Sequence, residues 1–237
     1  MIGVVIPAHN EQRYLDACLT AVRAAAADPA LMGEPVHVVV VLDSCDDGSR
    51  AIVERHGTVR THCHVDGIDV GARNVGVARA AGAARLLEMG ARWLAFTDAD
   101  TRVAPAWLAA QLSLDADVVC GTVAVDDWSP HHGDAELLRQ HFRRTYTDAD
   151  GHRHIHGANL GVSAAAYLLA GGFAPLGCSE DVALVAALEL CGARFAWSAA
   201  PRVTTSARCD ARASGGFGDT LLRCAALLRS EAAAGCS

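Results

Sequence analysis

The sequence predicts an open α/β sheet, mostly parallel, with helices on both faces. Short β-rich runs alternate with longer segments rich in Ala, Leu and Arg, an order typical of βα units. Residues 36–42 form a nearly continuous apolar run. A parallel strand that is covered on both faces has this composition, because neither of its sides meets water.

The elements follow from local patterns. Residues 2–7 are short and apolar and predict the first strand, whereas Leu15, Leu19 and Val22 recur at helical spacing and predict a helix over 11–27. Further strands are expected at 36–42, 58–65, 92–97 and 117–125. Further helices are expected after Ser49, over 72–89, after Pro105, and over 179–190 and 218–233.

Bulk composition excludes several kinds of protein. The net charge of −7 argues against a nucleic-acid binder, which needs a basic surface. The 20 basic side chains are all Arg, so neither a lysine Schiff base nor a lysine-dependent phosphate loop is available. The nine Cys include no Cys-x-x-Cys pair, and no apolar run approaches the roughly 18 residues of a membrane span. An apolar strand begins where a signal peptide would stand, so we expect a cytoplasmic protein without a transmembrane segment.

Polar clusters stand where three of the predicted strands end. They are residues 7–11, 43–49 and 98–101. Ligands of open α/β sheets collect beyond the carboxyl ends of the strands, so these clusters should converge. Asp98 and Asp100 could share a hard cation such as Mg²⁺ or Mn²⁺, although a turn or helix cap at Asp100-Thr101 would also explain them.

Six blocks in one order give the chain a resemblance to a known family. It resembles a family 2 glycosyltransferase with the GT-A fold of nucleotide-diphospho-sugar transferases, a Rossmann-like, mostly parallel sheet. The blocks are Val5-Ile6-Pro7-Ala8-His9-Asn10-Glu11, Val41-Leu42-Asp43-Ser44-Cys45-Asp46-Asp47-Gly48-Ser49, Gly71-Ala72-Arg73-Asn74-Val75-Gly76, Asp98-Ala99-Asp100, Gly157-Ala158-Asn159-Leu160-Gly161, and Gly171-Gly172-Phe173 with Ser179-Glu180-Asp181.

The resemblance implies a donor site for a nucleotide-diphosphate sugar. Asp43 would accept a hydrogen bond from the base, and Arg73 would lie near the base or the diphosphate. Asp98 would face the ribose or the sugar, while Asp100 would ligate Mn²⁺ or Mg²⁺. The other donor-binding residues would be Pro7, Ala8, Asn10, Glu11, Ala99 and Asn159.

The same resemblance implies a catalytic carboxylate. Asp181 would be the general base that takes the proton of an acceptor hydroxyl, with Glu180 as the alternative. Acidic residues are also favoured in the first turn of a helix, so Glu180 and Asp181 could serve a structural purpose as well.

Two regions depart from the family's pattern. The Gln-x-x-Arg-Trp motif of processive members is absent after Val203, where Arg208 and Arg212 stand four residues apart and could contact the diphosphate. His152, His154 and His156 alternate, and His156 is a third candidate metal ligand beside Asp98 and Asp100.

These patterns together predict one GT-A domain over 1–237, with a donor-binding half at about 1–125 and an acceptor and catalytic half at about 126–237. The function expected is a non-processive, inverting, metal-dependent hexosyltransferase that moves a sugar from a UDP- or GDP-linked donor to a hydroxyl acceptor. A nucleotidyltransferase and a non-catalytic nucleotide-sugar-binding domain are the alternatives. The sugar, the acceptor and the oligomeric state stay open.

Overall fold

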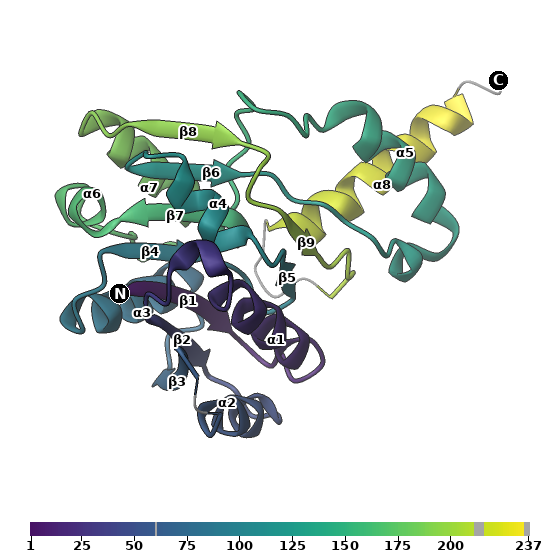
Figure 1. The fold of residues 1–237 in the computed structure, drawn as a ribbon. Coiled ribbons are helices and arrows are strands. Elements are labelled where there is room, and N and C mark those ends of the chain that lie inside the picture. The colour runs from purple at the N-terminus through teal and green to yellow at the C-terminus, as the bar shows by residue number, and fades with distance from the viewer. Residues whose placement is uncertain (60, 211–215, 235–237) are drawn as a thin grey trace.

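A seven-stranded mixed sheet forms the centre of the molecule (Figure 1). The computed structural model describes residues 1–59, 61–210 and 216–234. The strand order is β3-β2-β1-β4-β7-β6-β8, and β5 pairs with β9 in a separate two-stranded sheet. The strands are β1 (Ile2–Ala8), β2 (Val36–Asp43), β3 (Cys63–Val70), β4 (Trp93–Phe96), β5 (Thr101–Val103), β6 (Val118–Gly121), β7 (Leu160–Ser163), β8 (Phe195–Ser198) and β9 (Val203–Thr205).

Most of the strand pairs are parallel. In the seven-stranded sheet the pairs β1–β2, β2–β3, β1–β4 and β6–β8 run parallel, whereas β7 runs antiparallel to its neighbours β4 and β6. The separate pair β5–β9 is antiparallel. The parallel β3-β2-β1-β4 half brings the carboxyl ends of its strands to one edge, which is where the polar clusters stand.

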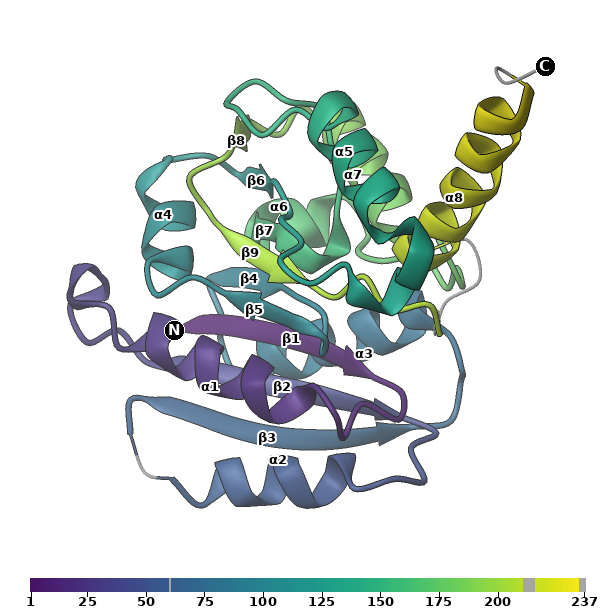
Figure 2. The same cartoon turned by 90° about the vertical axis from the view of Figure 1, so that its right-hand side faces the viewer.

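Helices cover both faces of the sheet (Figures 1 and 2). The α-helices are α1 (Leu15–Ala26), α2 (Ser49–Gly57), α3 (Val75–Glu88), α4 (Trp107–Ser113), α5 (Ala135–Thr145), α6 (Ala164–Leu169), α7 (Glu180–Leu190) and α8 (Phe217–Ala234). Short 3₁₀ turns are η1 (Pro29–Leu31), η2 (Ser129–Asp134) and η3 (Gly157–Asn159).

The two faces of each central strand build two separate cores. Val38 and Val40 of β2 pack with α1, α2 and α4, whereas their neighbours Val39 and Val41 pack with α3, α6 and α7. Successive side chains of a strand point to opposite faces, so a continuous apolar run fills both cores. The apolar composition of β2 is therefore explained by burial on both sides, as the sequence predicted.

A third, smaller core lies away from the sheet. Trp128, Leu138 and Leu221 are buried in it, and Phe142 and Phe217 pack against them. It joins η2, α5 and α8, which lie side by side above the carboxyl edge of the sheet (Figure 2). Helix α5 was not predicted, because residues 126–153 have a polar, His-rich composition that hides its single apolar face.

The third strand exists, but its predicted bounds of 58–65 are wrong. The strand β3 runs from Cys63 to Val70, and it lies at the edge of the sheet with alternate residues exposed. Asp66 and Asp69 point outward from this half-covered strand, and their charge made the segment unlike the other strands. The helix-cap alternative for Asp100-Thr101 is also wrong, because Thr101 begins β5.

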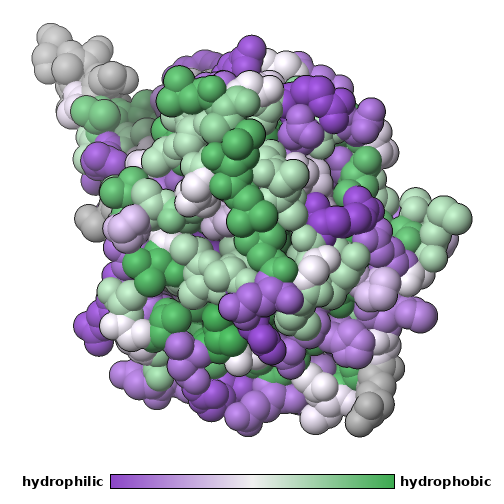
Figure 3. Space-filling view, turned by 90° about the vertical axis from the view of Figure 1, so that its left-hand side faces the viewer, coloured by the Kyte–Doolittle hydropathy of each residue, from purple (hydrophilic) through white to green (hydrophobic). Residues whose placement is uncertain are grey.

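One outer face carries exposed leucines. Leu168 and Leu169 of α6 and Leu190 at the end of α7 are 64%, 70% and 90% exposed. Figure 3 shows hydrophobic surface across the middle of this face.

None of the described helices combines the length and the apolar character that crossing a membrane requires.

Candidate active site

A cavity of about 850 Å³ lies at the carboxyl edge of β1, β2 and β4. It is closed on its other sides by α5, the first turn of α7, the segment after β9 and the start of α8. The predicted site residues that line it are Pro7, Ala8, Glu11, Asp43, Arg73, Asp98, Ala99, Asp100, His156, Glu180, Asp181 and Arg208. Gly157 and Ala158 also line it, so the fold brings residues from all six sequence blocks into one space.

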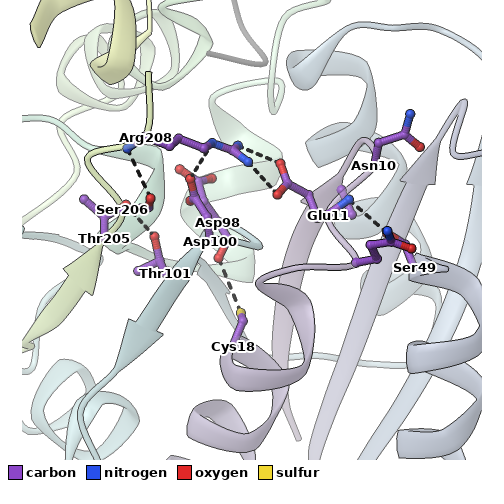
Figure 4. Close-up of polar contacts among 12 residues, drawn as sticks. Asn10, Glu11, Cys18, Ser49, Asp98, Asp100, Thr101, Thr205, Ser206 and Arg208 are labelled. Carbon is purple, nitrogen blue, oxygen red and sulfur yellow. Dashed lines mark hydrogen bonds and ion pairs between the residues drawn. The ribbon is translucent and has the colours of Figure 1, made fainter. Parts of the chain in front are cut away.

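The Asp98-Ala99-Asp100 turn follows β4 and presents both carboxylates to the cavity (Figure 4). Asp100 is the more enclosed, with 13% of its side chain exposed against 36% for Asp98. Burial raises the pKa of the Asp100 carboxyl to about 7, although the nearby Arg208 lowers it. A positive charge beside Asp100 would thus be strongly favoured at neutral pH.

Arg208 crosses the cavity from the segment after β9 to the loop after β1 (Figure 4). Its Nη1 and Nη2 donate to the two carboxylate oxygens of Glu11 at 2.7 and 2.6 Å, and its Nε lies 3.1 Å from Oδ2 of Asp100. The backbone N–H of Glu11 donates to Oγ of Ser49 at 2.9 Å, which fixes the loop. The bidentate pair of Arg208 and Glu11 joins residues 197 positions apart and thus connects the last part of the chain to the first.

Arg79 is a buried cation that the sequence analysis missed. Only 4% of its side chain is exposed; Nη2 donates to Oδ1 of Asp98 at 2.5 Å, and Nη1 pairs with Glu180. It shares a buried face of α3 with Gly82, Ala83 and Leu86. An Arg at such a helical position, in an otherwise Ala-rich segment, is the signal that could have revealed it.

Glu180 and Asp181 open α7 but lie in different surroundings. Glu180 is buried against Arg79, and burial raises its pKa. Asp181 lines the cavity, and its Oδ2 accepts a hydrogen bond from the backbone N–H of Gly157 at 2.7 Å while Oδ1 accepts one from Val182 at 2.8 Å. A carboxylate can accept further hydrogen bonds, so Asp181 keeps accepting capacity on the cavity side.

Asp43 organises the loop that carries Arg73. Its Oδ1 accepts hydrogen bonds from the backbone N–H groups of Ala72 and Arg73 at 2.9 and 2.8 Å, and its Oδ2 accepts one from Asn74 at 2.8 Å. These bonds hold Arg73 at a φ of 47°. The next residue, Asn74, caps α3, because its side chain accepts a hydrogen bond from the N–H of Val77. Asp43 therefore holds the backbone of this loop, and its predicted contact with the nucleotide base stays a prediction.

His156 lines the cavity as a neutral ring. Its Nε2 lies 2.9 Å from the hydroxyl oxygen of Tyr146, and burial lowers its pKa to about 4. His154 stacks on Tyr146 with ring centroids 4.1 Å apart, and His152 stacks on His154 at 5.5 Å. The rings of the alternating histidines stack in order, although no strand forms in this segment.

Comparison with known proteins agrees with this geometry. The sequence model for glycosyl transferase family 2 matches residues 3–168, which is more than half of the chain. The chain belongs to glycosyl transferase family 2. The comparison with curated proteins finds no match.

Solved structures show that this family 2 chain has the GT-A fold. It is similar to S. aureus TarS 1–349 in complex with UDP-GlcNAc, with 17% identity, 96% of this chain and 66% of that chain covered, and a TM-score of 0.63. It is similar to the mannosyltransferase PcManGT from Pyrobaculum calidifontis in complex with GDP-Man and Mn²⁺, with 18% identity, coverage of 86% and 56%, and a TM-score of 0.60. It is also similar to GalNAc-T7 with UDP, GalNAc and Mn²⁺, with 15% identity, 88% of this chain and 44% of that chain covered, and a TM-score of 0.62. The chain thus spans about two thirds of the TarS segment and about half of the other two.

Two predicted donor contacts of the family 2 chain need correction. Asn159 has no exposed surface; its Oδ1 accepts from the Trp107 indole at 2.8 Å, and its Nδ2 donates to two backbone carbonyls at 2.7 and 2.8 Å. Every group of this amide is used inside the protein, so it joins loops instead of binding a donor. Asn10 is absent from the cavity lining; it exchanges hydrogen bonds with Asp46 and joins the loops after β1 and β2. Arg212 lies outside the described residues.

The predicted metal set is only partly assembled. Within the part of the chain that the structure describes, no three His, Cys, Asp or Glu side chains are grouped to hold a metal, so His156 does not complete a site with Asp98 and Asp100. The two carboxylates still match a hard divalent cation, since Mg²⁺ takes one or two carboxylates and completes its shell with phosphate oxygens and water. The raised pKa of Asp100 agrees, because it marks a buried carboxyl whose negative charge Arg208 does not fully compensate.

Proposed function

We propose that the chain is an inverting, non-processive glycosyltransferase that moves a hexosyl group from a UDP- or GDP-sugar to a hydroxyl acceptor. The observation that carries this is the placement of Asp181 in the same cavity as Asp98 and Asp100, while Glu180 is held in a buried pair with Arg79. Asp181 is therefore our general base, and Glu180 is a positioning residue. The absence of Gln-x-x-Arg-Trp supports the non-processive assignment.

The donor would lie on residues of the first half, at about 1–125. Pro7, Ala8 and the Asp43 loop line that end of the cavity, and Arg73 is an exposed cation beside them. A nucleoside diphosphate is anionic, and arginine binds phosphate through two parallel hydrogen bonds. Support comes from the similar structures, which hold UDP-GlcNAc and GDP-Man.

Asp100 and Asp98 would hold Mn²⁺ or Mg²⁺ together with the diphosphate oxygens. A divalent cation at this position neutralises negative charge on the diphosphate. Two similar structures contain Mn²⁺. Arg208 would add charge-assisted hydrogen bonds to the same oxygens, and the position of its guanidinium beside Asp100 supports this.

The reaction needs one base on the acceptor side. The acceptor oxygen would form a bond to the anomeric carbon while the bond from that carbon to the diphosphate oxygen breaks, and the electron pair leaves with the nucleoside diphosphate. The hydroxyl proton would pass to Asp181, whose orientation is set by the Gly157 N–H. A single carboxylate acting in one displacement gives inversion at the anomeric carbon.

Nucleotide binding tests the donor assignment. UDP or GDP with Mn²⁺ should raise the melting temperature, because a ligand that binds only the folded state stabilises it. Loss of this effect for both nucleotides would contradict the donor site.

Substitution of the base tests catalysis. Asp181→Asn should keep nucleotide binding and lower the rate of sugar transfer by at least about a hundredfold, the usual contribution of a general base. Glu189→Gln, on the exposed side of the same helix, is the matched control and should keep full activity. Binding without any transfer would favour the non-catalytic alternative, and release of pyrophosphate from a nucleoside triphosphate would favour the nucleotidyltransferase.

A further inference from the structure

The cavity has two chemically different ends. One end, which we call the charged end, carries nine charged side chains: Glu11, Asp43, Arg73, Arg79, Asp98, Asp100, Glu180, Asp181 and Arg208. The other end is lined from α5 and α8 by side chains that we call the apolar wall: Leu138, Phe142, Tyr146, Phe217, Leu221 and Cys224. No described residue that α5 or α8 contributes to the lining carries a carboxylate or a guanidinium. The two ends must therefore suit ligand parts of different polarity.

The apolar wall is a packed structure. Leu138 and Leu221 are buried in the third core, while Phe142, Phe217 and Cys224 are only partly covered by it. Phe142 stacks on Tyr146 with ring centroids 4.5 Å apart, and Phe217 meets Phe142 edge-on at 6.3 Å. Aromatic groups held in this way offer rigid apolar area at little cost in side-chain entropy.

Most polar side chains at this end make an internal hydrogen bond, whereas Nδ1 of His141, which also lines the cavity, has no hydrogen-bond partner among the described residues. The hydroxyl of Thr145 donates to the carbonyl of His141, and that of Thr220 donates to the carbonyl of Gly216. The hydroxyl oxygen of Tyr146 accepts from the Val123 N–H at 2.8 Å and contacts His156 at 2.9 Å. The hydrocarbon and ring surfaces of the wall offer no hydrogen bonds, so each polyol hydroxyl group buried against them would cost on the order of 1–3 kcal/mol, whereas an aromatic ring buried there would not bring this cost.

The apolar wall is linked directly to the proposed base. Tyr146 contacts the ring of His156, and the next residue, Gly157, donates its N–H to Asp181. A molecule whose body covers the wall can thus present a hydroxyl group towards Asp181 without leaving the cavity. The partly covered aromatic rings make this region a subsite that an apolar ligand would complete.

We infer that the acceptor is an uncharged aromatic alcohol, with its ring system on the apolar wall and its hydroxyl group at Asp181. The inference rests on the proposed function for the transfer step, in which the acceptor oxygen replaces the diphosphate at the anomeric carbon and its proton goes to Asp181. Binding of the ring to the apolar wall does not require a bound donor, so it can be measured separately from transfer.

Direct binding of 2-naphthol to the full chain tests the subsite without any nucleotide. The naphthol fluorescence should change on binding, and Phe217→Ser should weaken binding at least about fivefold. Leu222→Ser, on the same helix but absent from the cavity lining, is the matched control and should bind as the wild type does. Circular dichroism of each variant confirms that α8 is kept.

The outcomes separate the two proposals. No binding of 2-naphthol, equal binding by Phe217→Ser, or preferential binding of methyl glucoside overturns the aromatic acceptor. Binding of 2-naphthol that is lost in Phe217→Ser supports it, even if neither UDP nor GDP stabilises the protein, a result that would contradict only the proposed donor. Once the donor is known, Phe217→Ser should raise KM for 2-naphthol, whereas Leu222→Ser should leave it unchanged.

Discussion

Nε of Arg208 lies 3.1 Å from Oδ2 of Asp100, so a guanidinium stands beside the carboxylate that we assign to the metal. The same side chain binds both carboxylate oxygens of Glu11, which is only 5% exposed. Arg208 thus stabilises two enclosed carboxylates at once, and it is a structural residue as well as part of the proposed donor site.

Arg208→Gln should therefore destabilise the protein even without ligand. Removing one partner of a buried ion pair leaves a buried charge uncompensated, and we expect a loss of about 3 kcal/mol in the free energy of unfolding. Urea denaturation at pH 7 measures it. Arg202→Gln removes a half-exposed pair with Asp148 and should cost less than about 1 kcal/mol. Equal stabilities of the two variants would contradict the structural importance of Arg208.

Asp100 should make stability fall as the pH rises. Burial raises its pKa to about 7 from an ordinary value of 3.8, so between these values the folded state binds a proton that the unfolded state has lost. Stability is therefore greatest below this window and declines through it as pH approaches 7. Asp100→Asn cannot titrate, and its stability relative to the wild type should increase by about 2 kcal/mol between pH 5 and pH 8.

Urea denaturation at the two pH values checks this slope. Asp115→Asn is the matched control, because that side chain is 98% exposed and should show no comparable change. A constant difference between Asp100→Asn and wild type would show that Asp100 is not destabilised by its burial.

The buried pair of Arg79 and Glu180 predicts a rescue. Arg79→Leu leaves Glu180 and Asp98 beside an apolar side chain, and we expect a loss of about 3–5 kcal/mol in the free energy of unfolding. The double variant Arg79→Leu with Glu180→Leu removes the orphaned charge and should recover part of that loss. Chemical denaturation of the single and double variants measures the coupling, and strictly additive losses would show that the pair does not interact.

The sequence predicted the parallel half of the sheet because burial there is simple. Residues 36–42 are apolar on both faces, and the observed strand β2 covers them. The edge strand β3 was misplaced since Asp66 and Asp69 face water, and α5 was missed since only Leu138 is fully buried on it. Local patterns thus succeed where both faces are covered and fail where one face is solvated.

The site residues show a similar division. Asp98 and Asp100 follow β4 and reach the cavity because strand ends of a parallel sheet share an edge. Asp181 lines the same cavity from the first turn of α7, and only the family's motif pointed to it. The pairing of Glu11 with Arg208 spans 197 positions and carries no local signature. Asn159 matched a family block, but its surroundings at Trp107 and two carbonyl groups, which only the fold creates, give it a structural task.

Gly157 contacts both the buried Arg79 and the proposed base Asp181. A Cβ atom there would collide with the guanidinium of Arg79, and the backbone N–H of Gly157 holds Asp181. Gly157→Ala must displace Arg79 from Asp98 and Glu180 or shift its own backbone, and either movement disturbs the proposed base. We expect a loss of about 2 kcal/mol in the free energy of unfolding, which is typical of an overpacked site. We also expect the rate of sugar transfer to fall at least about tenfold. Gly133→Ala, where a Cβ meets open space, is the control for denaturation and for transfer, and equal behaviour of the two variants would show that the close approach at Gly157 is unimportant.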